Sequence, residues 1–190
     1  MKTRISNTLF ILLATLVTLS GCTNHYKYKI GVSQCVGGAW RDKANVEMLS
    51  AQHLYDNDVK VIIKNADNNN ERQCLQIDSL VDEGVDLLVV SPNDYHDLNG
   101  SLQRAREKNI PIVFFDRTTA LKDYTAYIGG DNVEAGRKMA EYAVLLCRDS
   151  VKTDGRRPIV LEMTGPLAIS PAAQRHAGFS EVISKNPSID

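Results

Sequence analysis

Positive charge is not concentrated anywhere in this 190-residue chain. Its formal net charge is -1, and the 22 lysines and arginines form no dense block. Binding of nucleic acid usually requires a basic patch or stripe on the protein. A nucleic-acid partner is therefore not expected.

The motifs of common catalytic sites are missing as well. The sequence contains no Gly-x-Ser-x-Gly, P-loop or His-x-x-x-His pattern. Gly129-Gly130-Asp131 lacks the glycine spacing of a dinucleotide-binding turn. The four histidines are scattered, at His25, His53, His96 and His176. These absences predict that the chain is not an enzyme, and no cofactor is expected.

Cysteine is scarce, with four residues whose spacing fits no zinc site, so no metal is expected. Cys147 falls on the apolar side of an expected helix, where cysteine acts as a small core residue. Cys35 and Cys74 could lie near the same end of the fold. The sequence does not establish disulfide geometry, and two free thiols are the favoured interpretation.

The N-terminus has the pattern of an export signal. Lys2 and Arg4 precede an apolar run from Leu9 to Leu19, which is short for a membrane-spanning helix. The following Ser20-Gly21-Cys22 resembles the bacterial lipobox, whose cysteine is lipidated. We expect residues 1–21 to be a signal peptide and 22–27 a linker after lipidated Cys22. An uncleaved membrane anchor is the alternative, and both place the remaining chain in the periplasm, attached to the membrane.

The remaining sequence alternates apolar β-branched runs with amphipathic segments. This alternation predicts an α/β fold with a parallel sheet. The expected strands are Tyr28–Ser33, Val59–Lys64, Asp86–Val90, Ile110–Phe115, Tyr124–Ile128 and Pro158–Met163. The expected helices are Trp40–Tyr55, Glu71–Glu83, Tyr95–Asn109, Val133–Arg148 and one that opens at Ser170-Pro171. Four of these helices have an expected core face. Its residues are Val46, Leu49 and Leu54 in the first helix, Leu75, Ile77, Leu80 and Val81 in the second, Leu98, Leu102 and Ala105 in the third, and Met139, Ala140, Ala143, Val144 and Cys147 in the fourth.

Polar residues follow the ends of these strands. Ligands of open α/β sheets bind beyond the carboxyl ends of the strands. The strand Ile110–Phe115 ends at Asp116-Arg117, an acid and a base that can bind the hydroxyls of one polar ligand. The other strand ends bring Trp40, Asn68 and Asn93 to the same edge. The pattern predicts one polar cleft with an aromatic wall.

Six segments in register resemble the type I periplasmic sugar-binding proteins, in particular the ribose-binding group. They are Ile30-Gly31-Val32-Ser33, Asn68-Asn69, Ser91-Pro92-Asn93, Ile110–Arg117, Ile128–Asn132 and Ala173–Phe179. The resemblance implies the type I periplasmic-binding-protein fold, with a parallel sheet sandwiched by helices. It implies an N-terminal lobe at 28–129, nearly complete, and the truncated start of a second lobe at 130–190. We expect a chain that ends at Asp190 to bind sugar weakly or not at all.

The same resemblance assigns roles to individual residues. Asp116 and Arg117 are similar to the first-lobe pair that binds sugar hydroxyls, and Arg175 is similar to the second-lobe arginine. Trp40 matches a stacking aromatic, and Ser33 a small residue that lines the floor. Around Gly37 and Gly38, however, the Asn-Pro-Phe-Phe of the ribose group is absent.

A closer resemblance is to the periplasmic sensor domains of Bacteroides-type hybrid two-component systems. Gly31–Cys35, Trp40-Arg41 and Tyr124–Gly129 carry it. It implies a sensor that binds a monosaccharide or similar small polyol and signals to a kinase module. The alternative is a lipid-anchored binding protein that serves an ABC permease, which the lipobox favours. Regulators of the lac-repressor type share the fold but need a helix-turn-helix where the signal peptide stands.

Overall fold

The computed structural model describes residues 26–55, 58–96, 98–149 and 156–190. The signal peptide, Cys22 and most of the expected linker lie outside these residues. None of the helices in this described part has both the length and the apolar composition needed to cross a bilayer.

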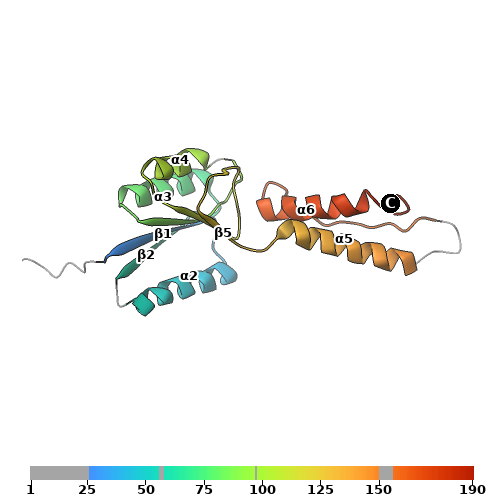
Figure 1. Ribbon diagram of the computed structural model, residues 1–190, viewed down its shortest axis with the longest axis horizontal. Coiled ribbons are helices and arrows are strands. Elements are labelled where there is room, and N and C mark those ends of the chain that lie inside the picture. Colours follow the sequence, from blue (N-terminus) through green and yellow to red (C-terminus); the bar gives the residue numbers. More distant parts are fainter. Residues whose placement is uncertain (1–25, 56–57, 97, 150–155) are drawn as a thin grey trace, which may run out of the picture.

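Five parallel strands form one sheet in the order β2-β1-β3-β4-β5 (Figure 1). The strands are β1 Tyr28–Gln34, β2 Val59–Asn65, β3 Leu87–Ser91, β4 Ile112–Phe115 and β5 Ala126–Ile128. Every neighbouring pair is parallel, which confirms the predicted sheet. Because β1 lies between β2 and β3, the strand order reverses there. In such sheets, ligand crevices form beside the reversal.

The helices cover the two faces of the sheet unequally. Helices α3 Asn70–Asp82 and α4 Asn99–Glu107 pack on one face, and α2 Ala39–Ala51 lies on the other (Figure 1). A short 3-10 helix, η1 Gln52–Tyr55, continues α2. The chain thus forms an α/β structure in which helices sandwich a parallel sheet, as the resemblance implied.

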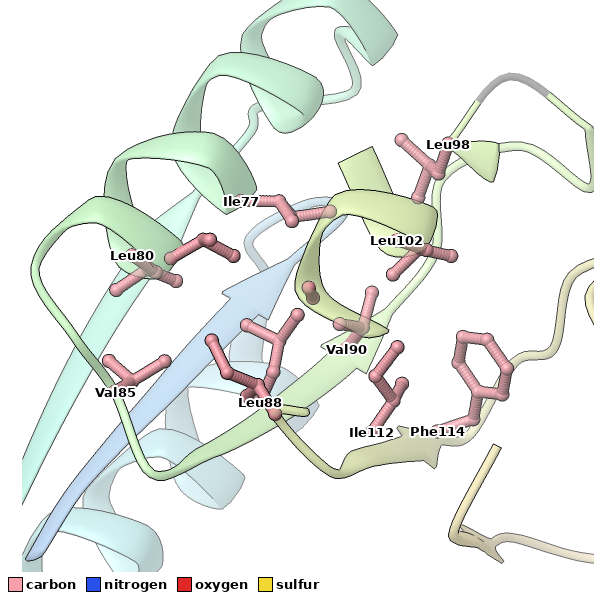
Figure 2. Packing of buried hydrophobic residues seen from close by; sticks show 12 residues of the cluster. Ile77, Leu80, Val85, Leu88, Val90, Leu98, Leu102, Ile112 and Phe114 are labelled. Carbon is pink, nitrogen blue, oxygen red and sulfur yellow. The ribbon is translucent and has the colours of Figure 1, made fainter. Parts of the chain in front are cut away.

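The main core lies between the sheet and the α3–α4 face. Figure 2 shows Ile77 and Leu80 of α3 and Leu102 of α4 above Leu88 of β3 and Phe114 of β4. All five side chains are fully buried. Each stabilises the fold by roughly 1.5–3 kcal/mol relative to an exposed side chain. The predicted apolar faces of α3 and α4 are correct here, although Leu75 is exposed.

The predicted inward face of α2 is wrong. Val46, Leu49 and Leu54 are 55%, 40% and 80% exposed. Met48 and Ala51 instead line an apolar groove of about 270 Å³ against the sheet. They lie on the face of α2 that also carries Arg41, because positions seven and ten residues apart share one side of a helix. The sequence therefore predicts the helix correctly but places its buried face on the wrong side.

Two further helices form a pair beside the sheet. Helices α5 Asn132–Asp149 and α6 Ser170–Ile183 run along each other (Figure 1). Ala140 and Val144 are buried, as predicted, whereas Met139 is 63% exposed. Glycines allow the helices to approach closely. A Cβ at Gly136 would lie 1.9 Å from the carbonyl oxygen of Arg175.

The segment Pro158–Met163, expected as a strand, forms no strand. Its main chain makes two hydrogen bonds to Asp190, from the amide of Val160 and to the carbonyl of Pro158. Within the described ranges no other main-chain group pairs with it across a ladder. A strand needs a partner strand to satisfy its amides and cover its side chains. Ile159 and Leu161 are accordingly more than 80% exposed.

Gly178→Ala is expected to destabilise the protein by about 1–3 kcal/mol. The added Cβ would lie 2.0 Å from the carbonyl oxygen of Val133, so α5 and α6 would have to separate. Thermal unfolding followed by circular dichroism measures the effect.

Gly100→Ala in α4 is the matched control, since nothing lies within 4 Å of its Cβ position. Reduced backbone freedom should make that variant about 0.5–1 kcal/mol more stable. An unfolding temperature unchanged by Gly178→Ala would show that the close approach of α5 and α6 is dispensable.

Candidate functional site

The carboxyl ends of β1, β3 and β4 meet at one edge of the sheet. Gln34 at the end of β1 pairs with Ser91 at the end of β3, and Asp116 directly follows β4. Arg41, in the first turn of α2, reaches all three. Its Nη1 donates to Gln34 Oε1 at 2.9 Å and to Ser91 Oγ at 2.8 Å. Its Nη2 donates to Asp116 Oδ2 at 2.7 Å.

Asp116 is held in an unusual backbone conformation. Its φ is +66°, in the left-handed region where Asp and Asn are enriched among residues other than glycine. Its amide donates to the carbonyl of Ile128 at 2.8 Å. The hydroxyl of Tyr127 donates to its carbonyl at 3.2 Å. Oδ2 is occupied by Arg41, so Oδ1 remains an acceptor without a partner among the described residues.

Tyr127 also fixes the chain that leaves the sheet. Burial raises the pKa of its phenol above the ordinary value, and the negative charges of Asp116 and Asp131 add to the effect. The hydroxyl therefore stays protonated at neutral pH, and its single proton is shared between the carbonyl of Asp116 and that of Gly130, which is 3.3 Å away. Its ring covers Gly129, where a Cβ would lie 2.2 Å from the hydroxyl oxygen.

Arg117 lies beside Asp116 with an unused donor. Its side chain is 15% exposed, and its Nε is 3.8 Å from Asp116 Oδ2. Nη1 is buried, and no acceptor within the described ranges bonds to it. Native proteins pair nearly all buried donors, so this guanidinium is suited to an acceptor from another molecule.

An aromatic pair borders these charges. Trp40 stacks on Phe115, with ring centroids 5.5 Å apart and planes 10° from parallel. The guanidinium carbon of Arg41 lies 5.2 Å from the centre of the Trp40 ring. Trp40 is nevertheless 58% exposed. The sequence predicted one aromatic in this wall, and the structure adds Phe115.

Gln73 forms a second buried centre beneath this edge. Its Nε2 donates to Ser33 Oγ at 3.1 Å and to the carbonyl of Ser91 at 2.9 Å. Its Oε1 accepts from the amide of Asn93 at 2.8 Å. Ser33 is fully buried, and its hydroxyl is a partner of Gln73. Its contact with a ligand stays a prediction.

The two predicted asparagines shape the loops at this edge. Asn68 has φ +61°, and its amide donates to the carbonyl of Cys35 at 2.8 Å. Its side chain is exposed. Asn93 is half-buried, and its Nδ2 donates to Asn70 Oδ1 at 2.6 Å. Asn68 follows β2 and Asn93 follows β3, the two strands that flank β1 in the sheet. Their contacts with a ligand stay predictions.

Arg175 lies apart from this cluster, on α6. Its exposed guanidinium donates to Asn132 Oδ1 at 2.6 Å. No hydrogen bond or ion pair in the described part of the chain links it to Asp116 or Arg117. The start of α6 does contact the loop that follows β4, since Ser170 Oγ accepts from the amide of Thr118 at 3.1 Å.

Neither metal ligation nor a disulfide contributes to this edge. No group of three histidine, cysteine or acidic residues suited to a metal occurs in the residues described. Cys35, Cys74 and Cys147, which all lie in the described part, form no disulfide.

A parallel sheet with convergent polar groups at its carboxyl edge defines a ligand-binding α/β domain. Residues 30–190 match the family model described as the periplasmic binding protein domain. The chain belongs to this family. The match confirms the resemblance and the fold class inferred from the sequence, and also that the domain is a binding domain and not an enzyme.

Known relatives bind sugars or polyols, according to their names. The ribose import binding protein RbsB of Bacillus subtilis is 27% identical over 65% of this chain and 38% of its own length. The xylitol-binding protein of Mycolicibacterium smegmatis is 27% identical over 70% of this chain and 36% of its own length. The chain thus spans well under half the length of these curated relatives.

Among solved structures, the fructose-binding periplasmic domain of the hybrid two-component system BT1754 is similar to this chain. It has 37% sequence identity and a TM-score of 0.75. The match covers 86% of this chain and 52% of that domain.

Gln73→Ala is expected to lower the free energy of unfolding by about 1–3 kcal/mol. The change leaves the buried Ser33 hydroxyl and the Asn93 amide without their partner. Urea unfolding measures this loss. Gln103→Ala, at an exposed position of α4, is the control and should change stability by less than about 0.5 kcal/mol. Equal midpoints for the two variants would contradict a structural role for Gln73.

Proposed function

We propose that this chain is the ligand-binding part of an exported receptor for a monosaccharide or similar small polyol. The observation that carries the proposal is the Asp116–Arg117 pair next to the exposed ring of Trp40. Asp116 offers a free acceptor oxygen, and Arg117 offers a buried donor without an acceptor among the described residues. The names of the relatives agree with this class of ligand.

The chemistry of a sugar suits these groups. Adjacent hydroxyls both donate and accept, so one sugar edge can donate to a carboxylate and accept from a guanidinium. The C–H face of a sugar ring is apolar and fits an aromatic surface. Trp40 is 58% exposed and supplies such a surface. Asn68 and Asn93 would add amide groups from the neighbouring loops.

Arg175 would bind the ligand from the opposite side. We expect residues 28–129 and 130–190 to belong to two lobes that close around the sugar. A ligand that contacts both lobes stabilises the closed state by its differential affinity. Gly129–Asn132 would absorb the rotation as the hinge, because glycines adopt backbone angles that other residues cannot.

Between the two possible roles, we favour a sensor domain. The sequence identity to the BT1754 periplasmic domain is 37%, whereas the identity to the ribose import binding protein and to the xylitol-binding protein is 27%. In this role the partner would be a kinase module. The alternative is a binding protein of an ABC permease, anchored through lipidated Cys22. Both roles require export to the periplasm by residues 1–21.

The reading frame after the codon for Asp190 separates these roles. A frame that completes the second lobe and continues into a transmembrane helix and kinase supports the sensor. A stop directly after a completed second lobe would exclude the sensor and favour the transport protein. Nucleotide sequencing of the gene gives this result.

Ligand binding can be followed through the single tryptophan of the 190-residue chain. The protein expressed from its complete reading frame, without residues 1–21, is titrated with fructose, ribose, xylose and xylitol by calorimetry. Trp40 fluorescence is recorded in parallel, as the difference in emission between this protein and its Trp40→Phe variant. We expect one of these ligands to bind and to change the Trp40 emission. Absence of binding across the panel would contradict the proposed class of ligand.

Asp116→Asn is expected to weaken that binding roughly 10- to 100-fold, since it removes the charge from a ligand hydrogen bond. Asparagine also suits the left-handed backbone at this position. Asp67→Asn is the matched control, because Asp67 also has a positive φ and an arginine partner, Arg72, but lies exposed. Equal affinities of the two variants would show that Asp116 is not a ligand residue.

A further inference from the structure

Arg41 is buried at a place where an arginine is normally exposed. It lies in the first turn of α2, whose other charged residues Asp42, Lys43 and Glu47 are exposed. Arg41 itself is 5% exposed. Arginines are almost never fully buried unless they are paired. The contacts of its guanidinium therefore indicate what this position requires.

Those contacts point in two directions. On one side, Nη1 and Nη2 bond to Gln34, Ser91 and Asp116 at 2.7–2.9 Å. On the other side, the guanidinium lies 5.2 Å from the centre of the Trp40 ring, within the range of a cation–π contact. One rigid, planar group thus contacts both the carboxylate and the aromatic ring of the candidate site.

The Arg41 contacts leave the binding groups of Asp116 available. The salt bridge uses Oδ2, and the Asp116 side chain remains 36% exposed. Arg117 makes only a longer approach of 3.8 Å to the same oxygen. Arg41 therefore fixes the direction of the carboxylate from behind, while Oδ1 and the Arg117 donor stay unused by the described residues.

Stability alone is a weak reason for such a pair. Apolar replacements of buried ion pairs are often neutral or stabilising, because both charges must lose water. The ion pair can instead serve to orient the binding groups, since a carboxylate and a ring that are already fixed lose less entropy when the ligand binds. Lysine could not replace the arginine fully, because a single ammonium lacks the planar fork that reaches several acceptors.

We propose that Arg41 is a positioning residue that holds the Asp116 carboxylate and the Trp40 ring in one binding geometry. Arg41 does not touch the ligand in this arrangement. The proposal rests on the proposed function for its biological meaning, but it predicts a coupling between Asp116 and Trp40 that exists without ligand.

The ligand-free coupling is tested through Trp40 fluorescence. In the 190-residue chain, Arg41→Met should lower the steady-state anisotropy of Trp40 and increase its quenching by acrylamide at least 1.5-fold. Asp116→Asn should act in the same direction, because it weakens the hold on Arg41. Arg41→Lys should give an intermediate value. Arg72→Met, which removes an exposed arginine paired with Asp67, is the matched control and should change nothing.

Circular dichroism and thermal unfolding accompany each variant. If Arg41→Met does not fold, the Asp116→Asn and Arg41→Lys variants still test whether Arg41 couples Asp116 to Trp40. Anisotropy and quenching that stay at the wild-type values in Asp116→Asn would overturn the proposal, since they would show that Trp40 does not respond to Asp116.

A double-mutant cycle on ligand affinity, measured with the protein expressed from its complete reading frame, then tests the consequence for binding. Arg41→Met and Asp116→Asn should each weaken binding about 10-fold or more, and the double variant should lose less than about 3-fold beyond the weaker single variant. If the loss of affinity in the double variant equals the product of the two single losses, the proposal is wrong, because the free-energy changes of independent mutations add. If no sugar binds the wild type, the proposed function fails, while the fluorescence result still decides the role of Arg41.

Discussion

The pairing of Arg41 with Asp116 is the constraint on which the candidate site depends. A guanidinium costs several kcal/mol to bury unless its donors are satisfied. Here the acceptors come from Gln34, Ser91 and Asp116, at the ends of β1, β3 and β4. Three strands must therefore end at matching depth for one side chain to be satisfied. The same requirement turns the Met48 side of α2 toward the sheet.

The sequence predicts the sheet well because strands buried on both faces have a local signal. Apolar runs such as Ile112–Phe115 mark the strands. The face of α3 with Ile77 and Leu80 follows from helical periodicity in the same way. Helical periodicity gives the wrong buried face for α2, because apolar residues occur on two of its faces. A charged residue such as Arg41 is also expected to face solvent. The segment Pro158–Met163 is wrongly predicted as a strand for a different reason. A strand needs partner strands, and the residues of the segment itself do not specify them.

Some residues of the candidate site can likewise be predicted from the sequence, and others cannot. Asp116, Arg117 and Asn93 could be found from the sequence because they directly follow strands, and the carboxyl ends of parallel strands share one edge. Arg41 and Gln73 could not. Their partners lie far away in the sequence: Arg41 and Asp116 are 75 positions apart, and Gln73 and Ser33 are 40 positions apart. The signal for such a residue would be a polar position in phase with a buried helix face, as Arg41 is with Met48.

The geometry also connects the two candidate sides of the cleft. The Tyr127 hydroxyl bonds to the carbonyls of both Asp116 and Gly130. Asn132 donates to that same Gly130 carbonyl at 3.2 Å and accepts from Arg175 at 2.6 Å. Hydrogen bonds, together with the covalent link between the side chain and the main chain of Asp116, thus connect Arg41 to Arg175 across the proposed hinge. A rotation at Gly129 and Gly130 would redirect the shared carbonyl, so the angle between the two proposed lobes and the placement of Arg175 would change together.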